Sequence, residues 1–448
     1  MEASELTEAV SADMPRIRAE LERLVRIPSI GFPDYDPANL RASAVATAAV
    51  LKTAGLQGVR LIEIPDGHPA VFGEVAGPSG TPTVLLYAHH DVQPEGSANE
   101  WASPPFEPEE RNGRLFGRGT SDDKCGIVMH AAALRAFGGK PPVGVKVIVE
   151  GEEECDADHL DFLIGEHIEM LRAGAVVIAD SGVWRRGTPA LTTSIRGVVA
   201  CTVEVRTLDK ALHSGVYGGP VPDAIMALAR MIASLHDAQG NVTVPGLVRG
   251  SVPAGAAPEI AEDDFRQEAG VRPGVERLGS GPLADQLWQG PSISVIGMDV
   301  PSIREASYQI VPVARAAVTM RIAPRQDPGP ALDALVRHLE ASAPWGVEVK
   351  VESESHGIGF ETPQGGRAYE AARRSLADAW GVEPVDMGMG GSVPLVPLLA
   401  QAMPGAEVLL TGPGDELSAA HSLDESVDLE ELRRACVAEA LFLHHMNE

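Results

Sequence analysis

The sequence predicts an α/β fold, with a mostly parallel sheet flanked by helices and a smaller α+β unit inserted into it. Before about residue 195, apolar strand-like runs alternate with helical stretches, as in βαβ units. From residue 198 to 205 every second residue is apolar, which is typical of a half-buried strand. Residues 324–330 are proline-rich and predict a linker, after which helices and strands alternate again. The unit between these points is therefore expected to interrupt one larger domain.

The predicted elements follow from apolar periodicity and flanking turn residues. The helices expected in the outer segments span residues 13–25, 125–137, 159–172, 331–343, 367–380 and 429–444. The strands expected beside them span residues 83–87, 143–149, 175–179, 347–351 and 407–410. The insertion is expected to hold strands 198–205, 292–296 and 314–322 and an amphipathic helix 224–236. Residues 240–290, rich in Gly, Pro, Ala and acidic side chains, are expected to form a long loop.

Composition limits the possible functions. A chain of 448 residues is too long for one ordinary domain. The formal net charge of −27 argues against binding nucleic acid or an anionic membrane surface. The four cysteines are scattered without CxxC spacing, so neither a disulfide framework nor a zinc–thiolate site is expected. The acidic N-terminus lacks the features of a signal peptide and no apolar run approaches a membrane span, so the expected location is cytoplasmic.

The most informative motif is His89-His90-Asp91, at the end of the first predicted strand. Residues two apart on a strand point to the same side, so His89 and Asp91 can converge on one point. The carboxyl ends of strands in an open α/β sheet are where ligands and metals bind. Alone, this pair is a weak signal, since a histidine beside an aspartate is common.

Further strand and loop ends add to this pair. Asp122 follows a glycine-rich turn, Glu153 and Glu154 follow the strand at 143–149, and Asp180 follows the strand at 175–179. His421 comes much later, after the strand at 407–410. Such a set suits two divalent ions, since bare carboxylates would repel one another. The simpler interpretation, a series of solvated acidic loops, explains each segment alone but not all of them together.

Because His421 and His89 must reach the same site, the outer segments should form one discontinuous domain. We place its boundaries at residues 1–196 and 326–448, with the inserted unit at 197–325.

These motifs, in this order, resemble a metallopeptidase family that includes carnosinase-like dipeptidases, aminoacylases, succinyl-diaminopimelate desuccinylase and glutamate carboxypeptidase. The resemblance implies that His89 and Asp180 hold one metal ion and that Asp122 bridges it to a second. Glu154 and His421 would hold the second ion. Zinc is the first expectation for both ions, with manganese and cobalt as alternatives, because carboxylate and imidazole ligands accept all three.

The resemblance also assigns the reaction chemistry. Two ions roughly 3.5–4 Å apart can share a hydroxide and polarise a scissile carbonyl. Glu153 matches the general base, which passes the proton of the attacking water to the leaving amine. Asp91 matches the carboxylate that orients His89 or its neighbour.

The resemblance makes the inserted unit a lid and dimerisation domain. In relatives, the residue matching His213 reaches into the partner's site and stabilises the oxyanion. Arg321 matches an arginine that holds the substrate carboxylate. Gly391 and Ser392 match a loop at the substrate terminus, where helix N–H groups can bind a carboxylate. The alternative, purely structural roles are capping of a helix for His213 and a surface ion pair for Arg321.

The chain departs from the family pattern at three places. His90 stands where small or apolar side chains are usual, and Cys125 replaces a frequent glycine. Gly388-Met389 occupy a position where relatives commonly carry Arg-Glu, which puts the substrate in doubt.

Three function classes therefore compete. The leading expectation is a dinuclear dipeptidase, favoured by residues 91–94 and 213–219. The alternatives are an N-acyl amino acid amidohydrolase with the same metal chemistry, and a non-catalytic scaffold, which would have no need of Glu153.

Overall fold

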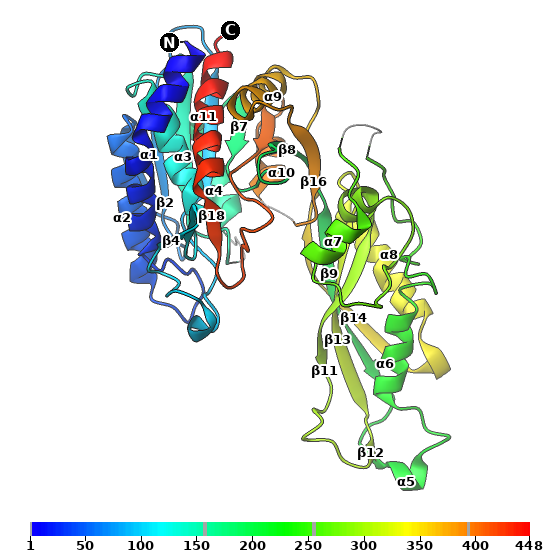
Figure 1. Cartoon of the computed structure of the whole chain (residues 1–448). Coiled ribbons are helices and arrows are strands. Elements are labelled where there is room, and N and C mark those ends of the chain that lie inside the picture. The colour runs from blue at the N-terminus through cyan, green and yellow to red at the C-terminus, as the bar shows by residue number, and fades with distance from the viewer. Residues whose placement is uncertain (1, 156–158, 253–256, 392–394) are drawn as a thin grey trace. The chain divides into compact units, whose positions relative to one another are not determined.

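The computed structural model describes residues 2–155, 159–252, 257–391 and 395–448 (Figure 1). The chain divides into two compact units. The first comprises Met1–Thr193, Thr362–Met387 and Val393–Glu448, and the second comprises Ser194–Glu361 and Gly388–Ser392. No described helix is both long and apolar enough to cross a membrane.

A nine-stranded sheet forms the frame of the first unit. The strand order is β1 (Gln57–Ile62), β2 (Ala70–Val75), β6 (Gly144–Glu150), β3 (Thr83–His89), β7 (Ala175–Ile178), β17 (Glu407–Leu410), β8 (Ala190–Ile195) and β15 (Phe360–Glu361), with β16 (Val385–Met389) also pairing with β8. Strands β6, β3, β7 and β17 pair with one another in parallel, whereas β1 with β2, β2 with β6, β17 with β8, and β8 with β15 pair antiparallel. The expected α/β fold with a mostly parallel central sheet is confirmed, with the parallel part at its centre.

The parallel centre of the sheet positions the site. His89 ends β3, and its Cα partner Glu150 ends the neighbouring β6. Asp180 lies two residues beyond the end of β7, which pairs with β3 on the other side. Because carboxyl ends of parallel strands meet at one edge of a sheet, residues far apart in sequence come together there.

One hydrophobic core contains Val84, Leu86 and Ala88 of β3 together with residues from five helices. These helices are α1 (Ala3–Val25), α2 (Pro37–Thr53), α3 (Lys124–Ala136), α9 (Arg367–Trp380) and α11 (Leu429–His445). The alternate β3 residues, Leu85 and Tyr87, lie outside this core, as strand periodicity requires. Helices α4 (Leu160–Leu171) and α10 (Leu395–Ala402) contact each other outside it. A small sheet of β18 (Ser426–Asp428), β5 (Arg114–Phe116) and β4 (Glu109–Arg111) ties the C-terminal segment to the first half of the chain.

A buried ion pair joins three of these elements. His130 of α3 places Nδ1 2.8 Å from a carboxylate oxygen of Glu439 in α11, and its Nε2 lies 3.0 Å from the carbonyl oxygen of Tyr87 in β3. Both partners are acceptors, so both ring nitrogens must donate and the imidazole is protonated. Burial lowers the pKa of His130, but the charge and hydrogen bond of Glu439 outweigh it, and the net pKa is raised.

This pair predicts a pH-dependent contribution to stability. A histidine whose pKa is raised on folding stabilises fully below its unfolded pKa of about 6.5, and the contribution is lost as pH rises through the folded pKa. Glu439→Gln is therefore expected to lower the free energy of unfolding by about 2 kcal/mol at pH 6. The difference from wild type should narrow as the pH is raised to 9, as measured by urea unfolding. A constant difference at both pH values would mean that His130 is neutral in the native protein.

The second unit is an α+β unit built on a four-stranded antiparallel sheet. The strand order is β11 (Ser292–Asp299), β13 (Val313–Ile322), β9 (Gly197–Arg206) and β14 (Glu348–Gly357). Helix α6 (Ala224–Ala233) packs on β9 and β13, and α8 (Pro328–Ala341) packs on β9 and β14. The remaining elements are β10 (Leu212–His213), α5 (Ser214–Tyr217), α7 (Glu262–Glu268), a π-helical turn at Asp285–Gln289, and β12 (Gln309–Ile310). Two 3₁₀ turns lie at Ala98–Glu100, in the first unit, and Pro344–Gly346.

The structure corrects the expected domain boundaries. Residues 194–196, 326–361 and 388–391 were expected in the larger domain, but they belong to the second unit. The largest of these differences is that of residues 326–361. The reason is hydrophobic: Ala331, Leu335 and Leu339 of α8 are buried in the same core as Val203 of β9. The expected linker is also shorter than predicted, because α8 begins at Pro328, where proline is tolerated in a first helical turn.

Candidate metal centre

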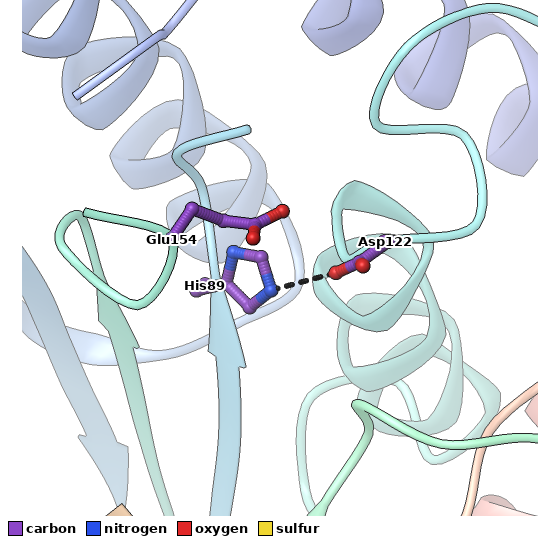
Figure 2. A group of neighbouring side chains, drawn as sticks. All are labelled: His89, Asp122 and Glu154. Atoms are coloured by element: carbon purple, nitrogen blue, oxygen red, sulfur yellow. Dashed lines mark hydrogen bonds and ion pairs between the residues drawn. The ribbon is translucent and has the colours of Figure 1, made fainter. Parts of the chain in front are cut away.

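His89 and Asp122 are in direct contact in the first unit. His89 is fully buried, and its Nε2 lies 2.9 Å from Asp122 Oδ1 (Figure 2). On the other side of the ring, Nδ1 lies 3.1 Å from the carbonyl oxygen of Asp91 and 3.3 Å from its carboxylate. The second carboxylate oxygen of Asp91 accepts a 2.9 Å hydrogen bond from the backbone N–H of Glu154. Asp91 therefore holds one side of the His89 ring and the backbone that carries Glu154.

Asp122 lies between two histidines. Its second carboxylate oxygen, Oδ2, is 3.0 Å from Nε2 of His421, and the same nitrogen is 3.0 Å from Oε2 of Glu154. Gln93 donates a 2.9 Å hydrogen bond to that glutamate oxygen. A carboxylate with one oxygen facing each histidine has the geometry that a bridge between two ions needs.

Two overlapping groups of ligand atoms emerge from these contacts. In each group, all the ligand atoms lie within 4.8 Å of one another. One group is His89, Asp122 and Glu154, whose side chains point toward one another (Figure 2). The other is His89, Glu153 and Asp180. With His421, the structure brings together every metal ligand expected from the sequence, together with the expected base.

The buried carboxylates of the cluster raise one another's pKa, as expected of a site that binds cations. Burial, followed by the charge of Asp122, raises the pKa of Asp180 to about 7. Burial and Asp180 raise the pKa of Glu153 well above its usual value. The hydrogen bonds that His421 donates to Asp122 and Glu154 raise its pKa to about 10, so its ring carries positive charge beside them. Buried carboxylates this close need positive charge, which divalent ions supply more effectively than protons do.

His421 is held by an unusual local backbone. Ala419, His421 and Asp424 all have positive φ, at 52°, 62° and 57°. Non-glycine residues rarely adopt this conformation, and its concentration around a functional side chain is typical of sites where geometry is imposed by the surroundings. The loop closes through a 2.9 Å hydrogen bond from the backbone N–H of Ser426 to the carbonyl oxygen of Ser418.

Comparison with known proteins identifies the family of this chain. Residues 85–445 match Peptidase family M20/M25/M40. The chain belongs to this family, and it is an enzyme. It is 34% identical over 435 residues to the cysteinylglycine-S-conjugate dipeptidase of Corynebacterium striatum, covering 96% of this chain and 95% of that protein. It is 27% identical over 386 residues to the Beta-Ala-His dipeptidase of Rattus norvegicus, covering 82% and 78% of the two proteins.

A solved structure extends the likeness to the fold. Human carnosine dipeptidase 1 matches with a TM-score of 0.82 and 22% identity, covering 100% of this chain and 99% of that one. The expected resemblance to the dipeptidase branch of the M20 family is thus confirmed.

The departures from the family pattern now have structural explanations. His90 points away from the site, with Nε2 2.9 Å from the carbonyl oxygen of Pro69, and burial lowers its pKa to about 4. Burial raises the pKa of the Cys125 thiol well above its usual value, which argues against a thiolate nucleophile. A Cβ on Gly388 would lie 2.4 Å from the Trp288 side chain, so this tryptophan fills the space that a larger residue would need.

The second unit carries the remaining predicted residues. His213 is exposed, and its Nδ1 accepts a 3.0 Å hydrogen bond from the backbone N–H of Gly215, as a helix cap would. Arg321 lies on β13, and its Nη1 is buried without a hydrogen-bond partner in the described part of the chain. Gly391 is described, but Ser392 lies outside the described residues.

Sequence reasoning missed several residues that support the site. Gln93 bonds Glu154, while Glu425 and Arg118 form a buried ion pair behind Asp122. Glu425 lies four residues after His421, and Arg118 lies four before Asp122. Their proximity in sequence to predicted ligands could have marked them as candidates. Their pairing could not be predicted, because they are 307 positions apart in the sequence.

Proposed function

We propose that this protein is a metal-dependent dipeptidase that acts on small dipeptides of the Cys-Gly or β-Ala-His kind. The observation that carries the proposal is the convergence of His89, Asp122, Glu154, Asp180 and His421 around Glu153, in a chain 34% identical to a dipeptidase over nearly its whole length.

The residues fit two divalent ions. His89 and Asp180 would hold one, Glu154 and His421 the other, and Asp122 would bridge them, as its two oxygens already face the two histidines. When bound, such ions lower the pKa of water and polarise the scissile carbonyl. The donor set of imidazoles and carboxylates suits zinc, with manganese and cobalt as alternatives.

The protein's own groups would move the proton. Glu153 lies beside Asp180 and His89 without being needed as a ligand, and it would take the proton of the attacking water and deliver it to the leaving amine. Asp91 would keep the His89 ring oriented through its contacts with Nδ1.

Arg321 would bind the substrate carboxylate. Burial lowers its pKa, and a guanidinium nitrogen without a partner is costly unless a ligand satisfies it. By the family resemblance, Gly391 and Ser392 would belong to the loop at the substrate terminus, whose N–H groups can bind a carboxylate.

A hydrolysis screen tests this proposal. Purified protein, loaded separately with zinc, manganese or cobalt, would be given Cys-Gly, β-Ala-His and a panel of N-acetyl amino acids. The proposal expects release of free amino acids from dipeptides. Hydrolysis confined to the N-acyl compounds would instead identify an amidohydrolase with the same metal chemistry.

A homodimer formed through the second unit is part of the proposal. Strand β11 lies at the edge of its sheet and exposes Ile296 and Met298. Ile303 is 95% exposed and Tyr308 88% exposed. Ser214, next to His213, donates a 3.0 Å backbone hydrogen bond to the carbonyl oxygen of Tyr308, and His213 itself pairs with Gln309, so His213 lies close to Tyr308 in the fold. An unpaired edge strand with exposed apolar side chains suits a two-fold contact with a second copy.

Subunit mixing tests whether His213 serves the partner's site. His213→Ala is expected to lower turnover by roughly 100-fold with metals still bound, as loss of an oxyanion donor does. Mixing it with inactive Glu153→Gln is expected to restore activity, because each mixed dimer then contains one site with both an intact Glu153 and a His213 from the other subunit. Absence of recovery, with subunit exchange verified by tagged co-purification, would mean that each chain has a complete site of its own.

A further inference from the structure

A fully buried carboxylate holds the loop that carries Asp122. One oxygen of Glu425 accepts hydrogen bonds from the backbone N–H groups of Ser121, at 2.9 Å, and Asp122, at 3.1 Å. Its other oxygen accepts from the backbone N–H of Gly119 at 3.0 Å. These three hydrogen bonds to one turn restrict the backbone at Asp122. Hydrogen bonds to a charged acceptor are stronger than those between neutral groups.

Arg118 balances the charge of this carboxylate and reaches two other loops. Its Nη1 donates to Glu425 at 2.7 Å, and only 2% of its side chain is exposed. Its Nη2 lies 3.2 Å from the carbonyl oxygens of both Pro94 and Ser422. Pro94 comes three residues after Asp91, and Ser422 directly follows His421.

The pair therefore connects three loops of the site. One carries Asp122, one carries His421, and the third carries Pro94, which follows Asp91 and Gln93 in the sequence. Glu425 fixes the backbone of Asp122, and Arg118 fixes the residue next to His421. Neither side chain serves as a ligand, because arginine offers only donors and both oxygens of Glu425 accept hydrogen bonds from backbone N–H groups. Burying two charges gives little net stability by itself, so such a pair is better explained by the geometry that it imposes.

We propose that Arg118 and Glu425 are positioning residues that set the distance between Asp122 and His421, and thereby the affinity for the ion held by Asp122, Glu154 and His421. This inference rests on the metal site of the proposed function. The ion held by His89 and Asp180 should depend on the pair less, because His89 lies on a strand of the central sheet and Asp180 only two residues beyond the end of another.

The test is zinc binding to metal-free protein, measured by titration against a competing chelator. Glu425→Gln keeps the shape of the side chain but removes its charge, and it is expected to weaken one of two zinc sites by about 10- to 100-fold. Asp386→Asn is the matched control, because Asp386 is also a buried carboxylate bonded to an arginine, Arg373, but contacts none of these loops. The control should keep both zinc affinities.

A His421→Ala background shows which ion is affected. There only the ion held by His89 and Asp180 is expected to bind, and adding Glu425→Gln should change its affinity much less than in the wild-type background. If Glu425→Gln does not fold, Arg118→Lys supplies the same test, since lysine keeps the charge but cannot reach Glu425 and two carbonyls at once.

Four results would overturn the inference. Equal weakening of both zinc sites, or the same weakening in Asp386→Asn, would mean that the pair only stabilises the fold. Unchanged affinities in Glu425→Gln would mean that it positions nothing. A wild-type protein that binds fewer than two zinc ions would overturn the metal site of the proposed function, and this inference with it.

Discussion

Glu153→Gln is expected to lower turnover by at least ~100-fold while two metal ions per chain remain bound. The amide keeps the size of the carboxylate but cannot accept the proton of the attacking water. Glu153 lies with His89 and Asp180 in one cluster, and the ligand set proposed for the two ions does not include it. Turnover on a dipeptide and metal content of the same preparation would be measured together.

Glu152→Gln is the matched control for this variant. Glu152 is adjacent in sequence, but its carboxylate accepts a 2.8 Å hydrogen bond from the backbone N–H of His68 and lies 3.1 Å from Nδ1 of His159. The Glu152→Gln variant should therefore keep most of the wild-type turnover. If Glu153→Gln retained activity within a few-fold and Glu152→Gln did not, Glu152 would be the base.

Asp122→Ala is expected to have the second large effect, the loss of tight binding of both ions. Its two carboxylate oxygens face His89 and His421, at 2.9 and 3.0 Å, so removing it takes a ligand from each ion at once. His89 and Glu154 would then face each other across an incomplete site. Metal analysis of the purified variant, after dialysis against buffer treated with chelating resin, measures the loss.

His90→Ala provides the contrast, because His90 is adjacent to a ligand without being one. The variant should keep both ions. It should still be less stable, since a fully buried side chain and its contact with Pro69 are removed. Loss of metal from His90→Ala, with retention in His89→Ala, would reverse the assignment of the ligands.

The features that could be predicted from the sequence are those whose local residue pattern allows few alternative structures or functions. Helix 367–380 and strand 407–410 were predicted with the bounds that α9 and β17 have. Here a single amphipathic face or a short apolar run determines the element. Likewise, histidines and carboxylates at successive strand ends predicted the cluster that the structure brings together.

The misses share a different cause, which is tertiary context. Helix α1 begins at Ala3 rather than residue 13, because Leu6 and Val10 are buried by other helices despite polar neighbours. Helix α2 was not predicted, since its many alanines and threonines show little periodicity. The pairing of Arg118 with Glu425 also depends on how distant segments fold together, which no local pattern records.

The most direct test of the account is a metal titration of the chelator-treated protein, followed by hydrolysis of Cys-Gly. We expect no activity without metal and a rise in activity that saturates at two ions per chain. Wild-type protein should reach this plateau, while His421→Ala should bind one ion and stay inactive. Full activity in the presence of chelator, or a plateau at one ion per chain, would contradict the dinuclear site proposed for this enzyme.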